Sequence, residues 1–202
     1  MSKPPLRLQH WLLFALLAGL FFAWGAWLMR GPQAATPLPW LLDWQARVLQ
    51  PLAEEHLSLA ALSAQLEGEL WLQPQSPGQE PRLLYRGSLP AQEGLWQLQA
   101  EVHLSGAERA SLVQAVGVTR EEQPLGPQMV GQLARQAVDV LELTAPAGVL
   151  AERLAATLGH PRLRLPLAEG EAWVYPQLGL TVRVQDDVLL TLRVVPKRAL
   201  QR

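Results

Sequence analysis

The segment from Trp11 to Met29 reads WLLFALLAGLFFAWGAWLM and contains no charged or strongly polar side chain. As an α-helix rising about 1.5 Å per residue it would be roughly 28 Å long, close to the ~30 Å hydrocarbon core of a bilayer. A soluble helix is rarely apolar on every face over this length. Trp11 lies at one end and Trp24 and Trp27 near the other, as expected for indole rings at the two interfaces. We therefore expect one transmembrane helix over residues 11–29.

The flanking charges favour one orientation of this helix. Lys3 and Arg7 precede it, whereas Arg30 is followed by mostly neutral residues as far as Asp43. Because cytoplasmic flanks carry an excess of Lys and Arg, we expect residues 1–10 in the cytoplasm, an inner-membrane anchor, and a periplasmic domain. The alternative is a cleaved signal peptide, whose apolar core is shorter, about 7–15 residues, and is followed by an A-x-A-like site. A retained anchor fits the longer segment better.

Small residues recur on one side of the expected anchor. Ala15, Gly19 and Ala23 fall at i, i+4 and i+8, a spacing that lets two membrane helices approach closely. The stripe is a candidate dimer face and makes a structural homodimer one possible reading. The alternative is that Ala and Gly are simply common in membrane helices.

Residues 30–53 lead from the anchor to the domain, which we expect over residues 54–196, followed by a tail at 197–202. Residues 31–39 hold three prolines and read as a stiff linker, while residues 40–52 suit a short amphipathic helix. Trp40 and Trp44, four residues apart on such a helix, could lie in the membrane interface. They could equally pack under the domain.

Composition narrows the classes of function. Apolar residues make up 49% of the chain, enough for a core, and the net charge of −1 offers no basic field for nucleic acid. The chain has no cysteine, which excludes disulfides, thiolate metal sites and a lipid-modified cysteine.

Two groups of strands with helices between them predict an α+β domain. Strands are expected over 69–73, 82–88 and 94–104; in the last, Trp96, Leu98 and Ala100 alternate with glutamines. Helices are expected over 56–66, over 105–117 after the capping box of Ser105 and Glu108, from Pro127 to about Leu141, and over 147–158. Three more strands, at 171–175, 180–184 and 188–195, have connections so short that they must form an antiparallel meander. The two strand groups could form two subunits, 54–105 and 146–196, joined by helices.

The C-terminal segment resembles a known kind of module. Its helix ends in Leu158-Gly159 before Pro161, and a strand with Trp173 and Tyr175 and two further strands follow. This order is similar to the helix-plus-meander modules of the SmpA/BamE type, which sit in the bacterial envelope and bind other proteins. The resemblance covers about a quarter of the chain, and the lipid-anchoring cysteine usual in that family is absent here. It implies a protein-binding envelope module without an active site.

No pattern in the sequence predicts chemistry. Metalloprotease, nucleophile-elbow, P-loop and dinucleotide motifs are missing, so we predict no catalytic residue, no metal site and no cofactor. Glu54, Glu55 and His56 are adjacent and do not face one another on a helix. Asp186 and Asp187 suit a turn between strands. An envelope hydrolase without a recognisable motif is the alternative function.

The candidate binding residues lie near the C-terminus. Trp173 and Tyr175 share one face of a strand and are either core residues or an aromatic binding patch. Arg162, Arg164 and Arg183 could ring the same end of the sheet and bind an acidic partner, or only keep the surface soluble. We expect a membrane-anchored accessory protein whose domain binds another envelope protein.

Overall fold

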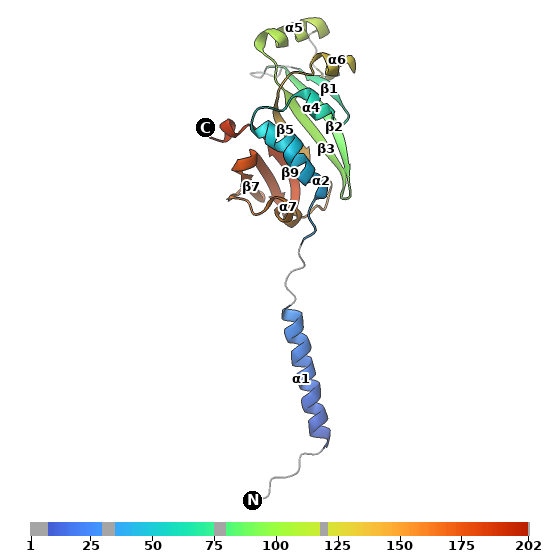
Figure 1. Cartoon of the computed structure of the whole chain (residues 1–202), viewed down its shortest axis with the longest axis vertical. Helices are drawn as coiled ribbons and strands as arrows, with labels where there is room; N and C mark the ends of the chain where they lie inside the picture. The colour runs from blue at the N-terminus through green and yellow to red at the C-terminus, as the bar shows by residue number, and fades with distance from the viewer. Residues whose placement is uncertain (1–7, 30–34, 75–79, 118–120, 202) are drawn as a thin grey trace, which may run out of the picture. The chain divides into compact units, whose positions relative to one another are not determined.

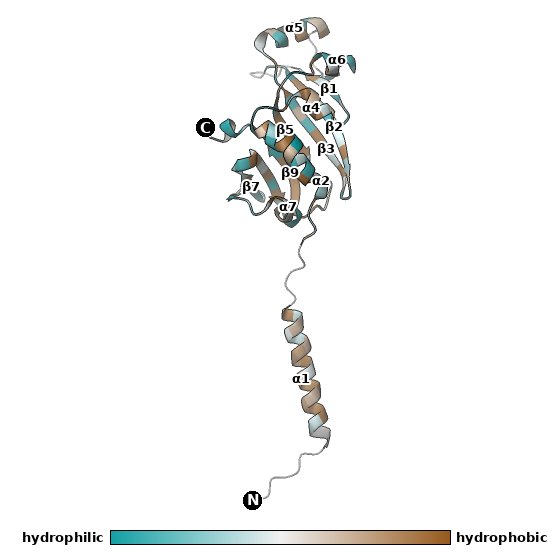
Figure 2. Ribbon diagram, in the orientation of Figure 1, coloured by the Kyte–Doolittle hydropathy of each residue, from teal (hydrophilic) through white to brown (hydrophobic). Residues whose placement is uncertain are grey.

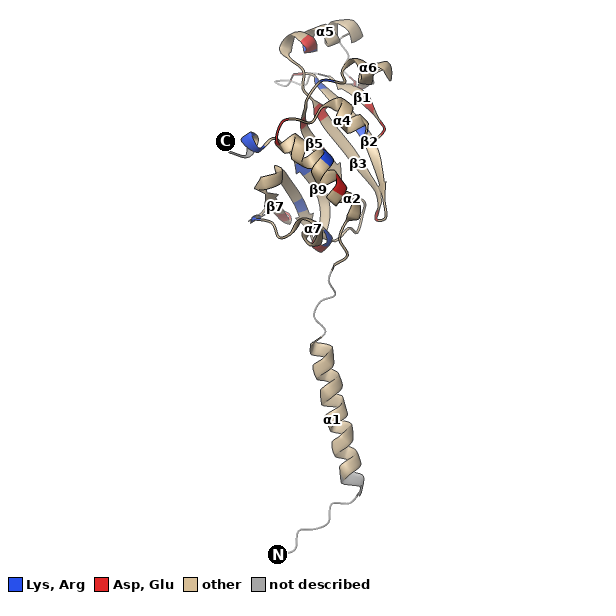
Figure 3. Ribbon diagram, in the orientation of Figure 1, with Lys and Arg blue, Asp and Glu red and all other residues tan. Residues whose placement is uncertain are grey.

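A computed structural model of the chain describes residues 8–29, 35–74, 80–117 and 121–201. It contains two compact units, Met1–Ala35 and Thr36–Arg202. The first holds helix α1 (Leu8–Leu28), which contains no Lys, Arg, Asp or Glu (Figure 3) and is mostly brown to white on the hydropathy scale (Figure 2). Its 18-residue window Trp11–Leu28 has a mean hydropathy of 1.9, and none of it is buried against the described chain. By length and composition, α1 is able to cross a membrane.

The second unit is built on one antiparallel sheet (Figure 1). In the described residues its nine strands follow the order β4-β1-β2-β3-β5-β9-β8-β7-β6. The first meander is β1 (Gly68–Gln73), β2 (Arg82–Ala91) and β3 (Gly94–Val102), with the short β4 (Gln123–Pro124) on its edge. The second is β6 (Leu163–Pro166), β7 (Glu171–Tyr175), β8 (Leu180–Gln185) and β9 (Val188–Val194). Strand β5 (Val138–Thr144) pairs with β3 on one side and β9 on the other.

Helices pack against one face of this sheet, which we call the inner face (Figure 1). Consecutive helical segments α2 (Pro39–Trp44), the π-helical η1 (Gln45–Leu49) and α3 (Gln50–Ala53) supply buried residues at helical spacing, including Leu41, Val48 and Leu52. Helix α4 (Leu59–Ser63) follows; Ser58 caps it, its hydroxyl accepting a hydrogen bond from the Ala61 N–H. Short helices α5 (Gly106–Val116), α6 (Gln128–Gln132) and α7 (Ala151–Leu158) lie in the connections, and η2 (Pro176–Leu178) and η3 (Lys197–Gln201) lie near the C-terminus.

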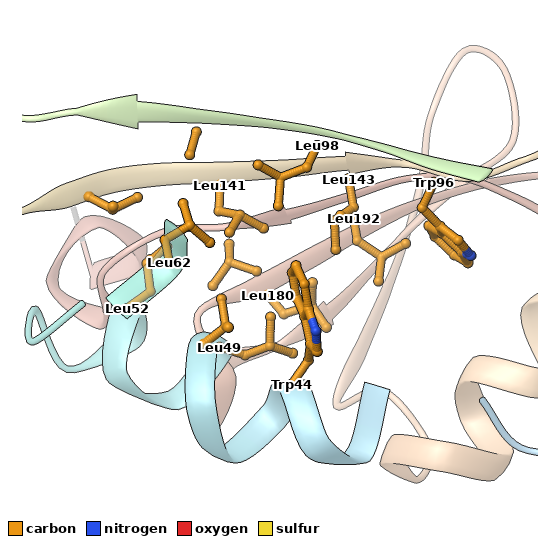
Figure 4. Close-up of a cluster of buried hydrophobic side chains, with 14 of the residues drawn as sticks. Trp44, Leu49, Leu52, Leu62, Trp96, Leu98, Leu141, Leu143, Leu180 and Leu192 are labelled. Carbon is orange, nitrogen blue, oxygen red and sulfur yellow. The ribbon is translucent and has the colours of Figure 1, made fainter. Parts of the chain in front are cut away.

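The core lies between the inner face and this helical layer (Figure 4). Leu98, Leu141 and Leu192 come from β3, β5 and β9 and point toward Trp44 and Leu52 of the helical layer. The core therefore runs without interruption across both meanders. It is the burial of this continuous apolar surface, worth about 25 cal/mol per Å², that stabilises the sheet as one unit.

The helix expected from Pro127 to Leu141 is wrong. Only α6 forms there, and residues 138–144 are strand β5. Leu133, Ala137 and Leu141 are spaced four residues apart, as on one side of a helix, but this spacing is a coincidence. Leu141 and Leu143 alternate with polar residues at period two, and the open edges of β3 and β9 provide hydrogen-bond partners for a strand at this place.

The domain begins earlier than residue 54, because Thr36–Arg202 is one compact unit. Trp44 is 5% exposed and Leu49 is fully buried, so of the two alternatives for residues 40–52 the one in which they pack under the domain is correct. The two strand groups are not separate subunits joined by helices either. Strand β5 joins them into one sheet.

Several expectations are confirmed. Ser105 and Glu108 form the reciprocal capping box of α5, and α7 ends at Gly159 with a positive φ of 83°. The C-terminal meander β7-β8-β9 has the expected antiparallel pairing. Asp186 and Asp187 adopt φ values of 50° and 61°, which place them in the tight turn between β8 and β9. Strands β4 and β6 were not expected. Three prolines and a glycine in residues 74–81 also predict a loop, and most of that segment lies outside the described residues.

Candidate functional site

The second face of the sheet, which we call the outer face, carries polar side chains. The strand registers place Glu69, Arg86, Gln99 and Glu142 in one cross-strand row running over β1, β2, β3 and β5. Residues directly opposite one another point to the same face, so these four side chains are neighbours. Glu69 and Gln99 are exposed and the other two are half-buried. The row continues onto β9 with the exposed Arg193.

This part of the outer face is hollowed. The hollow has a volume of about 950 Å³, within the range of ligand-binding clefts in proteins. Its lining combines one aromatic ring with amides, hydroxyls and charged groups from four strands: Glu67, Glu69, Trp71, Arg86, Ser88, Gln97, Gln99, Glu142 and Thr144. We call this set the outer-face hollow. The lining is open to solvent and mixes polar groups with apolar surface in similar amounts.

Hydrogen bonds hold the floor of the hollow in place. The hydroxyl of Ser88 donates to Gln97 Oε1 at 3.0 Å, and Arg86 Nε donates to Gln99 Oε1 at 3.2 Å. Because both amide oxygens accept from neighbours, the two amide NH₂ groups are left as the donors that a ligand meets.

Arg86 also contacts Glu122 and the ring of Trp71. Its guanidinium donates to both carboxylate oxygens of Glu122, at 2.6 and 3.0 Å, and lies 5.5 Å from the ring centroid of Trp71. The hydrogen bonds from Arg86 hold the pKa of Glu122 below its usual value, and hydrogen bonding to Glu122 raises the pKa of Arg86. The bidentate pair cancels the charge of the one arginine in the lining.

The three remaining charged groups of the hollow are carboxylates. Glu67 and Glu69 are exposed, Glu142 is half-buried, and none of the three makes an ion pair in the described structure. Arg193 stands opposite Glu142 in the register but outside the hollow, with no ion pair between them. The hollow therefore carries net negative charge.

Glu69 and Glu142 lie far apart for paired acid–base chemistry. Two strands separate Glu69 from Glu142 in the row, so their backbones lie about 14 Å apart at a strand spacing of about 4.8 Å. Glycoside hydrolysis needs two carboxyl groups within roughly 5–9.5 Å. The described residues also contain no group of three or more His, Asp or Glu side chains able to hold a metal ion.

A histidine–carboxylate pair lies elsewhere on the domain. His103 Nδ1 is 2.7 Å from Asp139 Oδ2, with both side chains well exposed. Ser105 is near in sequence, but its hydroxyl donates to Glu108 in the capping box. Without a hydroxyl bonded to the imidazole, the pair lacks the nucleophile of a catalytic triad.

Trp173 and Tyr175 are core residues. Their exposures are 4% and 6%, and they face the inner side of the sheet in line with Val182 and Leu180. The Tyr175 hydroxyl donates to the Gly159 carbonyl at 3.1 Å, and burial raises its pKa to about 12. Of the two interpretations, the one that places both rings in the core is correct. The aromatic binding patch is wrong, because a partner could not reach these buried rings.

The three arginines do not ring one end of the sheet. Arg164 stands opposite Trp173 and lies 4.3 Å from its ring centroid, whereas Arg183 stands opposite Ala172 and is exposed on the outer face. Arg162 precedes β6, and its backbone N–H donates to the Val174 carbonyl. Since Arg164 and Arg183 lie on opposite faces, no single acidic ligand contacts both.

In the first unit, Ala15, Gly19 and Ala23 lie on α1 and are exposed. A methyl group added at Gly19 would meet no described atom within 4 Å. The stripe is thus free of contacts within the described chain, and its role as a dimer face stays a prediction.

The residues of the outer-face hollow were not predicted as a site from the sequence. The alternation of Gln97 and Gln99 with apolar neighbours already indicates a polar face on β3. What the sequence lacks is the register that brings Glu69 and Glu142, 73 positions apart, into one row. No family model matches the chain, and the searches of curated proteins and of solved structures found no match either.

Proposed function

We propose that the chain is a membrane-anchored accessory protein of the bacterial envelope whose α+β domain binds another envelope protein through the outer face of its sheet. The observation that carries the proposal is the outer-face hollow. Helices cover the inner face of the sheet, and the outer face presents a concave surface of mixed polar and apolar groups, which is held by side-chain hydrogen bonds.

The other features agree with a binding role. Helix α1 is long and apolar enough to span a bilayer, and a retained span with the chain's N-terminus in the cytoplasm would hold the domain in the periplasm. Glu69 and Glu142 are separated by two strands, and elsewhere on the domain the Ser105 hydroxyl is bonded to Glu108, so the described residues show no catalytic constellation of a recognised kind at these two places. Binding is therefore favoured over hydrolysis.

The test is site-specific photo-crosslinking of the full chain in its native membrane. A photoreactive side chain replaces Gln99, on the outer face, or Arg47, an exposed residue of the helical layer that serves as the matched control. We expect a discrete protein adduct from position 99, identified by mass spectrometry, and a weaker one or none from position 47.

Equal adducts from both positions, or only self-adducts from position 99, would overturn the proposal. Turnover of a cell-wall substrate by the purified full chain, lost in Glu69→Gln or Glu142→Gln, would instead establish the hydrolase alternative. Orientation is checked separately, by protease protection of the domain in intact inner-membrane vesicles.

A further inference from the structure

We propose that the outer-face hollow binds an extended basic segment of the partner, with two cationic side chains four residues apart seated on Glu69 and Glu142. This inference deepens the proposed function and rests on it. It names the chemistry of the segment that the hollow accepts.

Charge is the first argument. Arg86 is neutralised by Glu122, which leaves Glu67, Glu69 and Glu142 as carboxylates without an ion-pair partner around the hollow. Such a surface repels phosphates and other anions and attracts ammonium or guanidinium groups. Arg193, beyond Glu142 in the row, reduces the negative charge at that end without pairing with it.

Geometry is the second argument. Glu69 and Glu142 belong to one row and are separated by three strand spacings, about 14 Å. An extended chain rises roughly 3.3 Å per residue, so residues i and i+4 lie about 13 Å apart. Since extended side chains alternate, these two residues also point to the same side. A segment lying across the strands therefore brings basic residues i and i+4 over the two carboxylates.

The floor between the two carboxylates suits a peptide backbone. The amides of Gln97 and Gln99 have their oxygens occupied by Ser88 and Arg86, so their NH₂ groups are free to donate to backbone carbonyls. Trp71, half-buried at one side of the hollow and 5.5 Å from the Arg86 guanidinium, adds an aromatic surface to the lining.

The experiment uses the full chain in neutral detergent micelles and measures fluorescence anisotropy of a labelled peptide, Gly-Lys-Thr-Ser-Thr-Lys-Gly. Two comparison peptides carry Gln in place of both lysines, or the two lysines two residues apart. The variant Glu69→Gln/Glu142→Gln removes the paired charges. The matched control, Asp43→Asn/Glu152→Gln, removes two exposed carboxylates of the helices.

We expect the first peptide to bind at low salt and the Gln peptide to bind at least about fivefold more weakly. The hollow variant should weaken binding of the first peptide by a similar factor, and the control variant should leave it unchanged. Salt near 1 M, where the Debye length is about 3 Å, should abolish the difference between the peptides.

Three results would overturn the inference. They are no detectable binding of the first peptide, equal binding of the Gln peptide, and affinity unchanged in the hollow variant. Salt-insensitive binding of a neutral chitin tetrasaccharide, lost in Glu69→Gln/Glu142→Gln, would assign the hollow to glycans instead. A crosslinked partner at position 99 together with a failed peptide test refutes only this inference. A positive peptide test without a partner refutes the proposed function.

Discussion

The pair of Glu93 and Arg153 gives the sharpest prediction about stability. Glu93 lies in the turn between β2 and β3, and its side chain is 2% exposed. Arg153 on α7 is 21% exposed and brings Nη2 within 2.6 Å of Glu93 Oε1. Neither Glu93 oxygen accepts a hydrogen bond of normal geometry from the described residues, so the buried carboxylate depends on this one cation.

Arg153 also holds the start of the domain. Its guanidinium donates to the carbonyls of Thr36 at 2.8 Å and Pro37 at 3.2 Å, while the Leu38 N–H donates to the Thr157 hydroxyl. The arginine thus fixes the first residues of the domain to α7 as well as neutralising Glu93.

We predict that Arg153→Met destabilises the domain by about 3–5 kcal/mol, because it leaves a buried carboxylate without a counter-charge. Glu93→Gln/Arg153→Met removes that charge and should recover at least about 2 kcal/mol of the loss. Urea unfolding of the full chain in neutral micelles, followed by tryptophan fluorescence, measures both changes as shifts in midpoint at constant slope.

The double variant separates the effect of the unpaired Glu93 charge from the loss of the other contacts of Arg153. If Arg153→Met costs less than about 1 kcal/mol, or if the double variant is no more stable than the single one, Glu93 is not a buried charge that needs Arg153. A loss of the same size in both variants would assign the effect to the carbonyls of Thr36 and Pro37.

Three further predictions concern the tyrosines, two glycines and the anchor. Tyr85 and Tyr175 are the only tyrosines, and burial raises the pKa of both, that of Tyr175 to about 12. Because the pKa of an unfolded tyrosine is about 10, the free energy of unfolding should keep its full value below pH 10 and fall as the pH rises toward 12. Absorbance titration near 295 nm of Tyr85→Phe and Tyr175→Phe should show that the remaining tyrosine of each variant ionises above the ordinary range. Gly170→Ala should lower the free energy of unfolding by at least about 3 kcal/mol, since its Cβ would meet the Val184 carbonyl. Gly148→Ala, at a similar positive φ but in open space, should lower it by only about 1 kcal/mol. Thermal unfolding measures both changes, and equal losses would contradict this prediction. Gly19→Ile should reduce self-association in micelles measured by energy transfer, with Leu20→Ile as control, and an unchanged Gly19→Ile variant would eliminate the dimer face.

Local signals predicted much of the fold. Period-two alternation located β3 and β8, the capping box located α5, and the apolar segment located α1. These features depend on residues close together in the chain, where propensity and side-chain hydrogen bonds act directly.

Non-local pairing explains what could not be predicted. Leu133, Ala137 and Leu141 have helical spacing, and only the free edges of β3 and β9 make residues 138–144 a strand. Strand β6 is exposed on both faces, so Leu163 and Leu165 give no sign of a buried side. The outer-face hollow depends on the register of four strands, which no local pattern records.

Strand β5 has a consequence for how the domain acquires its structure. Its partner on the far side is β9, which follows all the other described strands in sequence, and β8, β7 and β6 are then added outward in reverse sequence order. A chain that emerges N-terminus first completes β1, β2, β3 and β5 before β9 exists. The backbone groups of β5 that later pair with β9, at residues Leu141 to Thr144, then have no partner strand. Such an edge is a template for aberrant pairing until residues 188–194 are available. Chains cut short before Val188 should therefore aggregate, although β1 to β8 are all present in them.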